Sequence, residues 1–203
     1  SGDRRCPAPA RPAAPPSAAA CVRRGAEMAA ALLPDPSPPT RGEAEGLVWR
    51  RNRPVALDPL SGWFLDAQDL AFAHPFARFP FDRDEWEELL TRPSPAFFYA
   101  EAGGVPFAHF GLRPTDDAVH LCFLVMDPGR RGQGLSRPLI RLTAAAGRTL
   151  LPGSERMSLN VADGNLRAER LYLSLGFRRN GRAEEGMFQM DRPLGPRPPW
   201  DRP

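Results

Sequence analysis

Residues 124–136 combine an apolar run with a segment rich in glycine and arginine, residue types that bind phosphate groups. The run ends in Leu124-Val125-Met126, and Asp127-Pro128 then lead into Gly129-Arg130-Arg131-Gly132-Gln133-Gly134-Leu135-Ser136. Glycine lets the backbone approach a bulky anion, and the first N–H groups of a following helix have no intrahelical acceptors. The pattern predicts a cradle for a phosphorylated ligand, with an ordinary surface turn as the alternative.

Two other kinds of phosphate site are excluded by these residues. The dinucleotide-binding fingerprint needs a third glycine, whereas this segment continues from Gly132 and Gly134 to Arg137. All 27 cationic side chains of the chain are arginines. Nucleotide-hydrolysing loops, Schiff-base enzymes and pyridoxal-phosphate enzymes are therefore excluded, because each needs a lysine amine.

A second segment, residues 165–177, places a tyrosine on one face of a predicted helix. Ala168, Leu171, Tyr172 and Leu175 recur at the i, i+3, i+4 and i+7 positions of that face, and Gly176 is suited to end the helix. Taken alone, this segment would make Tyr172 a core aromatic residue.

Together and in this order, the two segments resemble the GNAT superfamily of coenzyme A-dependent N-acetyltransferases. Its cofactor loop, Arg/Gln-x-x-Gly-x-Gly/Ala, is matched at 131–136, with Ser136 in place of the final small residue. Its second motif, Asn-x-x-Ala-x-x-x-Tyr-x-x-x-Gly-Phe, is matched at Asn165, Ala168, Tyr172, Gly176 and Phe177. The resemblance extends over residues 47–194 and is specific over 119–177.

The resemblance implies transfer of an acetyl group from acetyl-coenzyme A, with no metal, to a primary amine that attacks directly. The backbone of Leu124 and Met126 would bind the pantetheine arm, and one N–H there would face the thioester oxygen. Asn165 would touch the same arm, and Tyr172 would act as general acid toward the leaving sulfur. The diphosphate would lie on the loop, with charge from Arg131 and N–H groups from Gly132, Gln133, Gly134, Leu135 and Ser136.

The general base is a separate question. His120 is the one histidine in the expected strand 119–126, and an imidazole can titrate near neutral pH. Glu101 acting through a water relay is a competing base, and His120 could instead close the turn after Asp116-Asp117. Cys122, a thiol on an apolar strand, is expected to pack as a small hydrophobic residue.

Charge is unevenly distributed and points to the kind of acceptor. Residues 54–126 hold eleven acidic residues against four arginines, and residues 127–203 hold eight against fourteen. By family analogy the amine enters near five of these acids, so we expect a cationic amine, either a small molecule or a peptide: Asp82, Asp84, Glu85, Glu87 and Glu88. Six aromatic residues line that pocket or form core: Trp63, Phe72, Phe76, Phe79, Phe81 and Trp86.

The order of predicted elements indicates an α/β (α+β) fold. Strands are expected at 47–53, 96–102, 106–112, 119–126, 157–161, 177–179 and 187–191, and helices at 65–74, 82–90, 135–150 and 166–175. Such an order favours one mixed sheet with helices on both sides. The resemblance implies a mostly antiparallel sheet of six to seven strands, splayed between its fourth and fifth strands.

Composition separates the chain into three parts. Residues 1–45 hold nine prolines and twelve alanines and are expected to be a disordered arm, followed by the acetyltransferase domain at 46–194 and a proline-rich tail at 195–203. The three cysteines include no close pair, which favours a reduced, cytoplasmic protein over a disulfide framework or a zinc site. No apolar run approaches the roughly 20 residues that cross a bilayer, so no membrane association is expected.

Two other function classes fit parts of the sequence. A non-catalytic sensor of the same fold would bind an acyl-coenzyme A without turnover. Nucleic-acid binding is suggested by a pI of about 9.1, but the arginines lack interleaved aromatic residues or a reading helix, so no nucleic-acid partner is expected. The expected assembly is a monomer or a homodimer.

Overall fold

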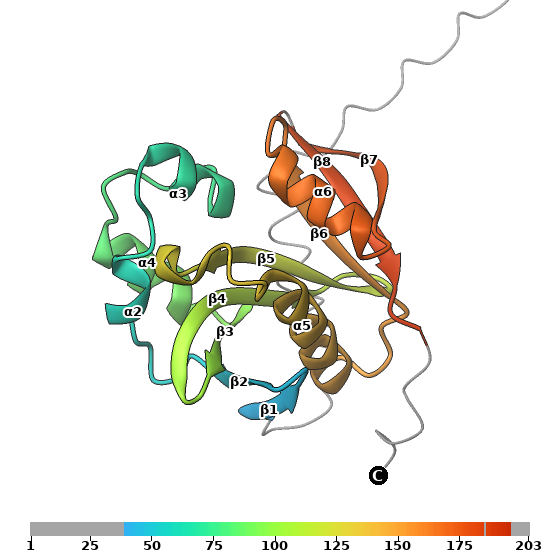
Figure 1. Cartoon of the computed structure of the whole chain (residues 1–203), viewed down its shortest axis with the longest axis horizontal. Coiled ribbons are helices and arrows are strands. Elements are labelled where there is room, and N and C mark those ends of the chain that lie inside the picture. Colours follow the sequence, from blue (N-terminus) through green and yellow to red (C-terminus); the bar gives the residue numbers. More distant parts are fainter. Residues whose placement is uncertain (1–38, 185, 196–203) are drawn as a thin grey trace, which may run out of the picture.

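One twisted sheet organises the described part of the chain, residues 39–184 and 186–195 of this computed structural model (Figure 1). The sheet order is β1-β2-β3-β4-β5-β6-β8-β7, and every neighbouring pair is antiparallel except the parallel pair β5–β6. The predicted mixed, mostly antiparallel sheet is therefore confirmed. The strands are β1 (Arg41–Ala44), β2 (Leu47–Arg51), β3 (Ala96–Ala102), β4 (Val105–Pro114), β5 (Ala118–Met126), β6 (Arg156–Ala162), β7 (Arg178–Glu184) and β8 (Met187–Pro193).

The eight described strands exceed the predicted six to seven because of β1, so the ordered domain begins before the predicted boundary at Gly46. Glu45 (φ 59°) and Gly46 (φ 73°) form the tight turn that pairs β1 with β2, since such turns need positive φ at both central residues. Gly42 leaves room for the Trp49 ring, which a Cβ there would approach to 2.6 Å. The prolines and alanines nearby mask this short strand in the composition. The rest of the predicted arm (1–38) and all but the first residue of the predicted tail lie outside the described residues.

Helices cover both faces of the sheet and define two cores. Alternation along β3 sends Phe98 and Ala100 to the core beneath α5 (Ser136–Leu150) and α6 (Leu166–Ser174). The intervening Phe97 and Tyr99 reach a second core with the short helices α2 (Asp58–Ser61), α3 (Ala67–Ala73) and α4 (Arg83–Thr91). None of the helices in the described residues has the length and apolar character needed to span a bilayer.

The sheet opens between β5 and β6. Their parallel pairing runs from Ala118↔Arg156 to Leu121↔Leu159 and stops there, although β5 continues to Met126 and β6 to Ala162. In the same region β5 holds one residue more than β4, with Cys122 and Val125 opposite Gly111 and His109. Phe123 adopts a positive φ of 51° inside this bulge. A bulge bends its strand and increases the local twist, so β5 turns away from β6.

Candidate active site

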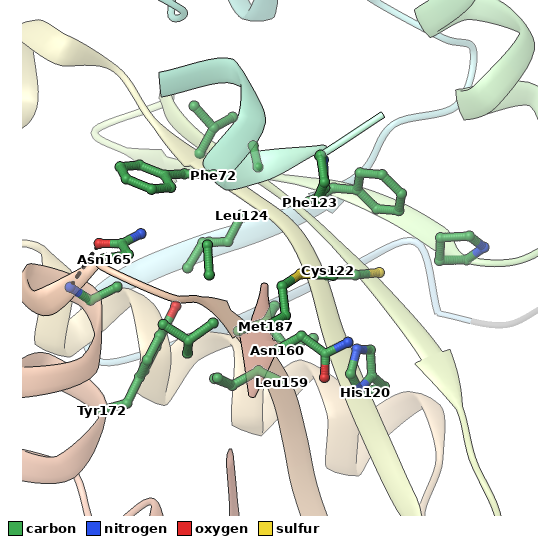
Figure 2. A pocket seen from close by; sticks show the side chains of 18 of the residues that line it. Phe72, His120, Cys122, Phe123, Leu124, Leu159, Asn160, Asn165, Tyr172 and Met187 are labelled. Carbon is green, nitrogen blue, oxygen red and sulfur yellow. Dashed lines mark hydrogen bonds between the residues drawn. The ribbon is translucent and has the colours of Figure 1, made fainter. Parts of the chain in front are cut away.

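A cavity of about 1210 Å³ lies where β5 and β6 diverge (Figure 2). Residues of α3, β5, α5, β6 and α6 line it, so it is bounded by elements that are far apart in the sequence. Seven of the predicted catalytic and cofactor-binding residues line this one cavity: His120, Leu124, Met126, Arg131, Ser136, Asn165 and Tyr172. Gly132, Gln133, Gly134 and Leu135 are not among its lining residues; they follow Arg131 in the loop that leads to Ser136.

Tyr172 reaches the cavity from α6. Its ring packs against Phe177 with centroids 5.5 Å apart, and the residue is only 8% exposed. Figure 2 shows the hydroxyl pointing into the cavity, on the side of Leu124 and Asn165. Burial raises the pKa of the phenol to about 12, so the group stays protonated through the neutral and mildly alkaline range. The geometry leaves it able to donate a proton.

The far end of β5 presents backbone groups to the opening. The N–H of Asp127 donates to the carbonyl of Phe107 at 2.8 Å, so the groups of Asp127 face β4. Because the backbone groups of successive strand residues point to opposite edges, the N–H of Met126 faces the opening instead. Leu124 lines the same side of the cavity. An extended ligand lying along this edge could pair with β5 as a missing strand would.

The glycine-rich loop has the conformation expected of an anion cradle. Gly132 and Gly134 adopt φ of 79° and 77°, which side-chain-bearing residues rarely adopt, and a Cβ on either would meet no atom within 4 Å. Within the described residues, the N–H groups of Gly132, Gly134 and Ser136 have no intramolecular acceptor. Gln133 braces the loop, since its Nε2 donates to the carbonyl of Gly129 at 2.7 Å. Open space above free N–H groups at the start of α5 fits a diphosphate.

Arg131 makes contacts within the chain that the sequence did not predict. Its Nη1 and Nη2 donate to the two carboxylate oxygens of Asp69 at 3.1 and 2.8 Å, and Nη2 also donates to the carbonyl of Trp63 at 3.1 Å. Its Nε donates to the carbonyl of Met126 at 3.1 Å. The guanidinium therefore joins α3 to the end of β5. These contacts use four of its five N–H donors, so Arg131 has a structural role beside the expected contribution of its charge to the diphosphate.

We expect Arg131→Met to lower the free energy of unfolding by about 2 kcal/mol, because it leaves the half-buried Asp69 carboxylate without its charged partner. Chemical denaturation measures this change, with the neighbouring Arg130→Met as control. A variant that kept its stability but lost affinity for acetyl-coenzyme A would instead show the diphosphate role alone.

Asn165 lies at the start of α6 beside Tyr172. Its Oδ1 accepts from the N–H of Ala168 at 3.2 Å and caps the helix (Figure 2). The Nδ2 group has no partner among the described residues, so it remains free to bind an extended ligand in the cavity. The capping bond explains why an asparagine at this position is compatible with both structure and binding.

His120 lines the cavity but does not titrate near neutral pH as expected. It is 4% exposed, and its Nδ1 lies 2.9 Å from the hydroxyl oxygen of Ser158 on β6. Burial, with a smaller contribution from the charge of Arg113, lowers the pKa of His120 to about 3. In Figure 2 His120 and Tyr172 lie on opposite sides of Leu159. A neutral imidazole here can accept a hydrogen bond but is a weak base.

The acidic residues expected at the acceptor site lie elsewhere. Glu101 accepts from Nε of Arg50 at 2.7 Å and is not among the lining residues, which removes the support for a water relay from it. The five acids of residues 82–88 also lie outside the lining, since α4 buries Trp86, Leu89 and Leu90 and turns Asp84, Glu87 and Glu88 to solvent. Of the aromatic set, Phe72 and Phe76 line the cavity, whereas Trp63 and Trp86 belong to the second core.

The cavity residues that were not recognised as functional in the sequence include Arg113, Asn160 and Cys122. Asn160 Oδ1 is buried and has no partner among the described residues, and Figure 2 shows this side chain beside His120. Burial raises the pKa of the Cys122 thiol to about 12, so the thiol stays protonated. An asparagine within an apolar strand and an arginine at a strand end were the signals present. No group of side chains suited to a metal ion occurs in the described residues.

Comparisons with known proteins agree with this geometry. Residues 63–177 match the acetyltransferase (GNAT) family, and the chain therefore belongs to this family, as its two motifs predicted. Over 101 residues it is 42% identical to a mycothiol acetyltransferase of Kineococcus radiotolerans, a match covering 47% of this chain and 32% of that protein. The chain thus spans about a third of the length of this relative.

Solved structures share the fold at low identity. A spermidine N-acetyltransferase from Vibrio cholerae, solved with CoA and spermine, has a TM-score of 0.62 at 19% identity, covering 74% of this chain and 97% of that one. An acetyltransferase from Thermus thermophilus has a TM-score of 0.59 at 21% identity, covering 72% and 96%. These similarities show a GNAT fold, the mixed sheet opened between β5 and β6.

Proposed function

We propose that this protein transfers an acetyl group from acetyl-coenzyme A to a primary amine by direct attack. One observation carries the proposal: a continuous cavity extends from the start of α5, beside the glycine loop, past the free edge of β5 to the hydroxyl of Tyr172. Membership of the acetyltransferase family supports the same reaction class. The cavity, at about 1210 Å³, exceeds the roughly 300–1,000 Å³ of ordinary small-molecule pockets, which suits two substrates that must meet.

The residues divide the binding work along the cavity. The N–H groups of Gly132, Gly134 and Ser136 hold the diphosphate, and the N-terminus of α5 favours its negative charge. The free edge of β5 at Leu124 and Met126 binds the pantetheine arm, together with Asn165. Arg131 holds α3 against the end of β5, where the arm binds.

Acetyl-coenzyme A supplies an activated acetyl group as a thioester. As the new C–N bond forms and the C–S bond breaks, the N–H of Met126 stabilises the negative charge on the acetyl oxygen. Tyr172 gives its phenolic proton to the departing sulfur, so the products are a neutral amide and a thiol. The proton released by the nitrogen returns to the phenol through solvent.

His120 accepts a hydrogen bond from the acceptor nitrogen and orients it, rather than removing a proton. With a pKa near 3 the imidazole is neutral throughout the working range. A base this weak takes up a proton from an ammonium group only to a very small extent, so it contributes little to deprotonation of the acceptor. The acceptor must therefore lose its proton to solvent before it attacks.

A thiol-release assay with acetyl-coenzyme A and a panel of amines tests the proposal, run between pH 6 and pH 10. We expect kcat/KM to rise with pH, and the midpoint of this rise to match the pKa of each acceptor amine. At alkaline pH kcat/KM should not fall, because Tyr172 stays protonated. We expect His120→Ala to lower kcat/KM by about tenfold while keeping this rise. A midpoint fixed near 6.5 for every amine, lost in His120→Ala, would show that His120 is the base.

The alternative is a sensor that binds an acyl-coenzyme A without turnover. Calorimetry with acetyl-coenzyme A distinguishes it, because binding with no thiol release for any amine would support the sensor. The protonated phenol at the inner side of the cavity favours the enzyme, since a binding module has no use for a general acid there.

A further inference from the structure

The end of the cavity away from Tyr172 and the glycine loop is built by three chain segments. They are residues 92–95 before β3, the end of β4 at Arg113 and Pro114, and the start of β5 at His120. Arg113 and His120 are directly paired in the β4–β5 register, so their side chains stand on the same face of the sheet. An acceptor that approaches the thioester from the side opposite to coenzyme A must pass these residues.

This end of the cavity is positively charged. Among the lining residues of the described chain there is one carboxylate, Asp69, and Arg131 occupies both of its oxygens. The other charged lining residues are arginines: Arg92 and Arg113 at this end, and Arg167 at the start of α6, near Asn165. Arg92 pairs with Glu88 at 2.9 Å, but the two side chains are 54% and 76% exposed, so this ion pair is weak.

Arg113 is the arginine at this end of the cavity that has no counter-charge among the described residues. It has no hydrogen bond or ion pair with any other described residue, although it is partly buried at the cavity wall. Its positive charge acts to lower the pKa of both His120 and Cys122, which lie on the neighbouring strand. A guanidinium has five N–H donors in a planar fork, and this fork matches the two oxygens of a carboxylate.

We propose that the acceptor is a primary amine that also carries a carboxylate, and that Arg113 binds this carboxylate and determines acceptor specificity. The inference rests on the proposed function. The substrate class is that of amino acids and related amino carboxylates, in place of the purely cationic amine that the charge count suggested. Polyamines are disfavoured, because their positive charges would meet Arg113 and Arg92 with no free carboxylate lining the cavity.

The positive charge of Arg113 also favours the reaction. A positive charge beside an ammonium group lowers its pKa, since the charged form is disfavoured. An acceptor held at Arg113 therefore has more of its amine in the neutral, reactive form at a given pH. The charge of Arg113 thus favours deprotonation of the acceptor, which the weakly basic His120 does not.

Matched acceptor pairs test the inference with the full-length chain: phenylalanine against phenylalaninamide, β-alanine against β-alaninamide, and spermidine as a polycation. We expect kcat/KM for each acid to exceed that of its amide by about tenfold or more, from a charge-assisted bidentate contact. Arg113→Met should remove this preference by lowering kcat/KM for the acid alone, and Arg113→Lys should restore part of it. Arg41→Ala, an exposed arginine of β1, is the control for loss of one positive charge and should keep the preference.

Each outcome decides one question. Amides or spermidine turned over as well as the acids, with no selective effect of Arg113→Met, would overturn the inference while the proposed function stands. An equal loss for acid and amide in both Arg113 variants would show a structural role and would also overturn it. Acetyl-coenzyme A binding without turnover of any amine would refute the proposed function, and the inference with it.

Discussion

Tyr172→Phe is expected to lower kcat by about 100-fold, because general acid catalysis of this kind contributes factors of 10² to 10⁴. The phenylalanine keeps the contact with Phe177, so folding and the shape of the cavity are preserved. Affinity for acetyl-coenzyme A should therefore remain unchanged. Steady-state thiol release gives kcat, and calorimetry gives the affinity.

The chain contains a matched control, because Tyr99 is its other tyrosine. Tyr99 is also buried, but its hydroxyl donates to the carbonyl of Ala56 at 2.6 Å in the second core and does not line the cavity. Tyr99→Phe should cost about 1 kcal/mol of stability and leave kcat unchanged. Equal kcat values for wild type and Tyr172→Phe would remove Tyr172 as the acid.

Gly134→Val should weaken binding of acetyl-coenzyme A by about 100-fold. A β-branched residue at a φ of 77° is strained, and its side chain would project from the loop whose N–H groups are free for the diphosphate. Relaxation of that strain would turn the N–H groups away from the anion, at a further cost in charge-assisted hydrogen bonds. Calorimetric titration with acetyl-coenzyme A measures the change.

Gly104→Val is the control for backbone strain. Gly104 has a φ of 80° in the turn between β3 and β4, with no atom within 4 Å of a Cβ, and it is not a cavity residue. This variant should lose stability while keeping its affinity for acetyl-coenzyme A. If both glycine variants bound acetyl-coenzyme A as wild type does, the diphosphate would lie elsewhere.

Local patterns in the sequence were sufficient for the elements that hold the site. The helical spacing of Ala168, Leu171 and Tyr172 predicted α6, and the structure places Tyr172 at the cavity as well as in the core. Glycine spacing at 132 and 134 predicted backbone freedom, and both residues have positive φ. These features depend on neighbours a few residues away, which a single sequence displays.

Features that depend on distant partners could not be predicted. The ion pair between Asp69 and Arg131 joins residues 62 positions apart, and nothing in either segment distinguishes a carboxylate partner from a phosphate partner. Asp84, Glu87 and Glu88 of α4 contribute to the charge count but face solvent, because helix packing buries Trp86 and Leu90 instead. The burial that lowers the pKa of His120 likewise arises from the whole fold.

A crystal structure of the protein with coenzyme A tests the central claim most directly. The account predicts the diphosphate on the N–H groups of Gly132, Gly134 and Ser136, with the pantetheine arm along β5. It also predicts the sulfur within about 3.5 Å of the Tyr172 hydroxyl, as proton transfer requires. A coenzyme bound outside the opening between β5 and β6, or a sulfur beyond the reach of that hydroxyl, would contradict it.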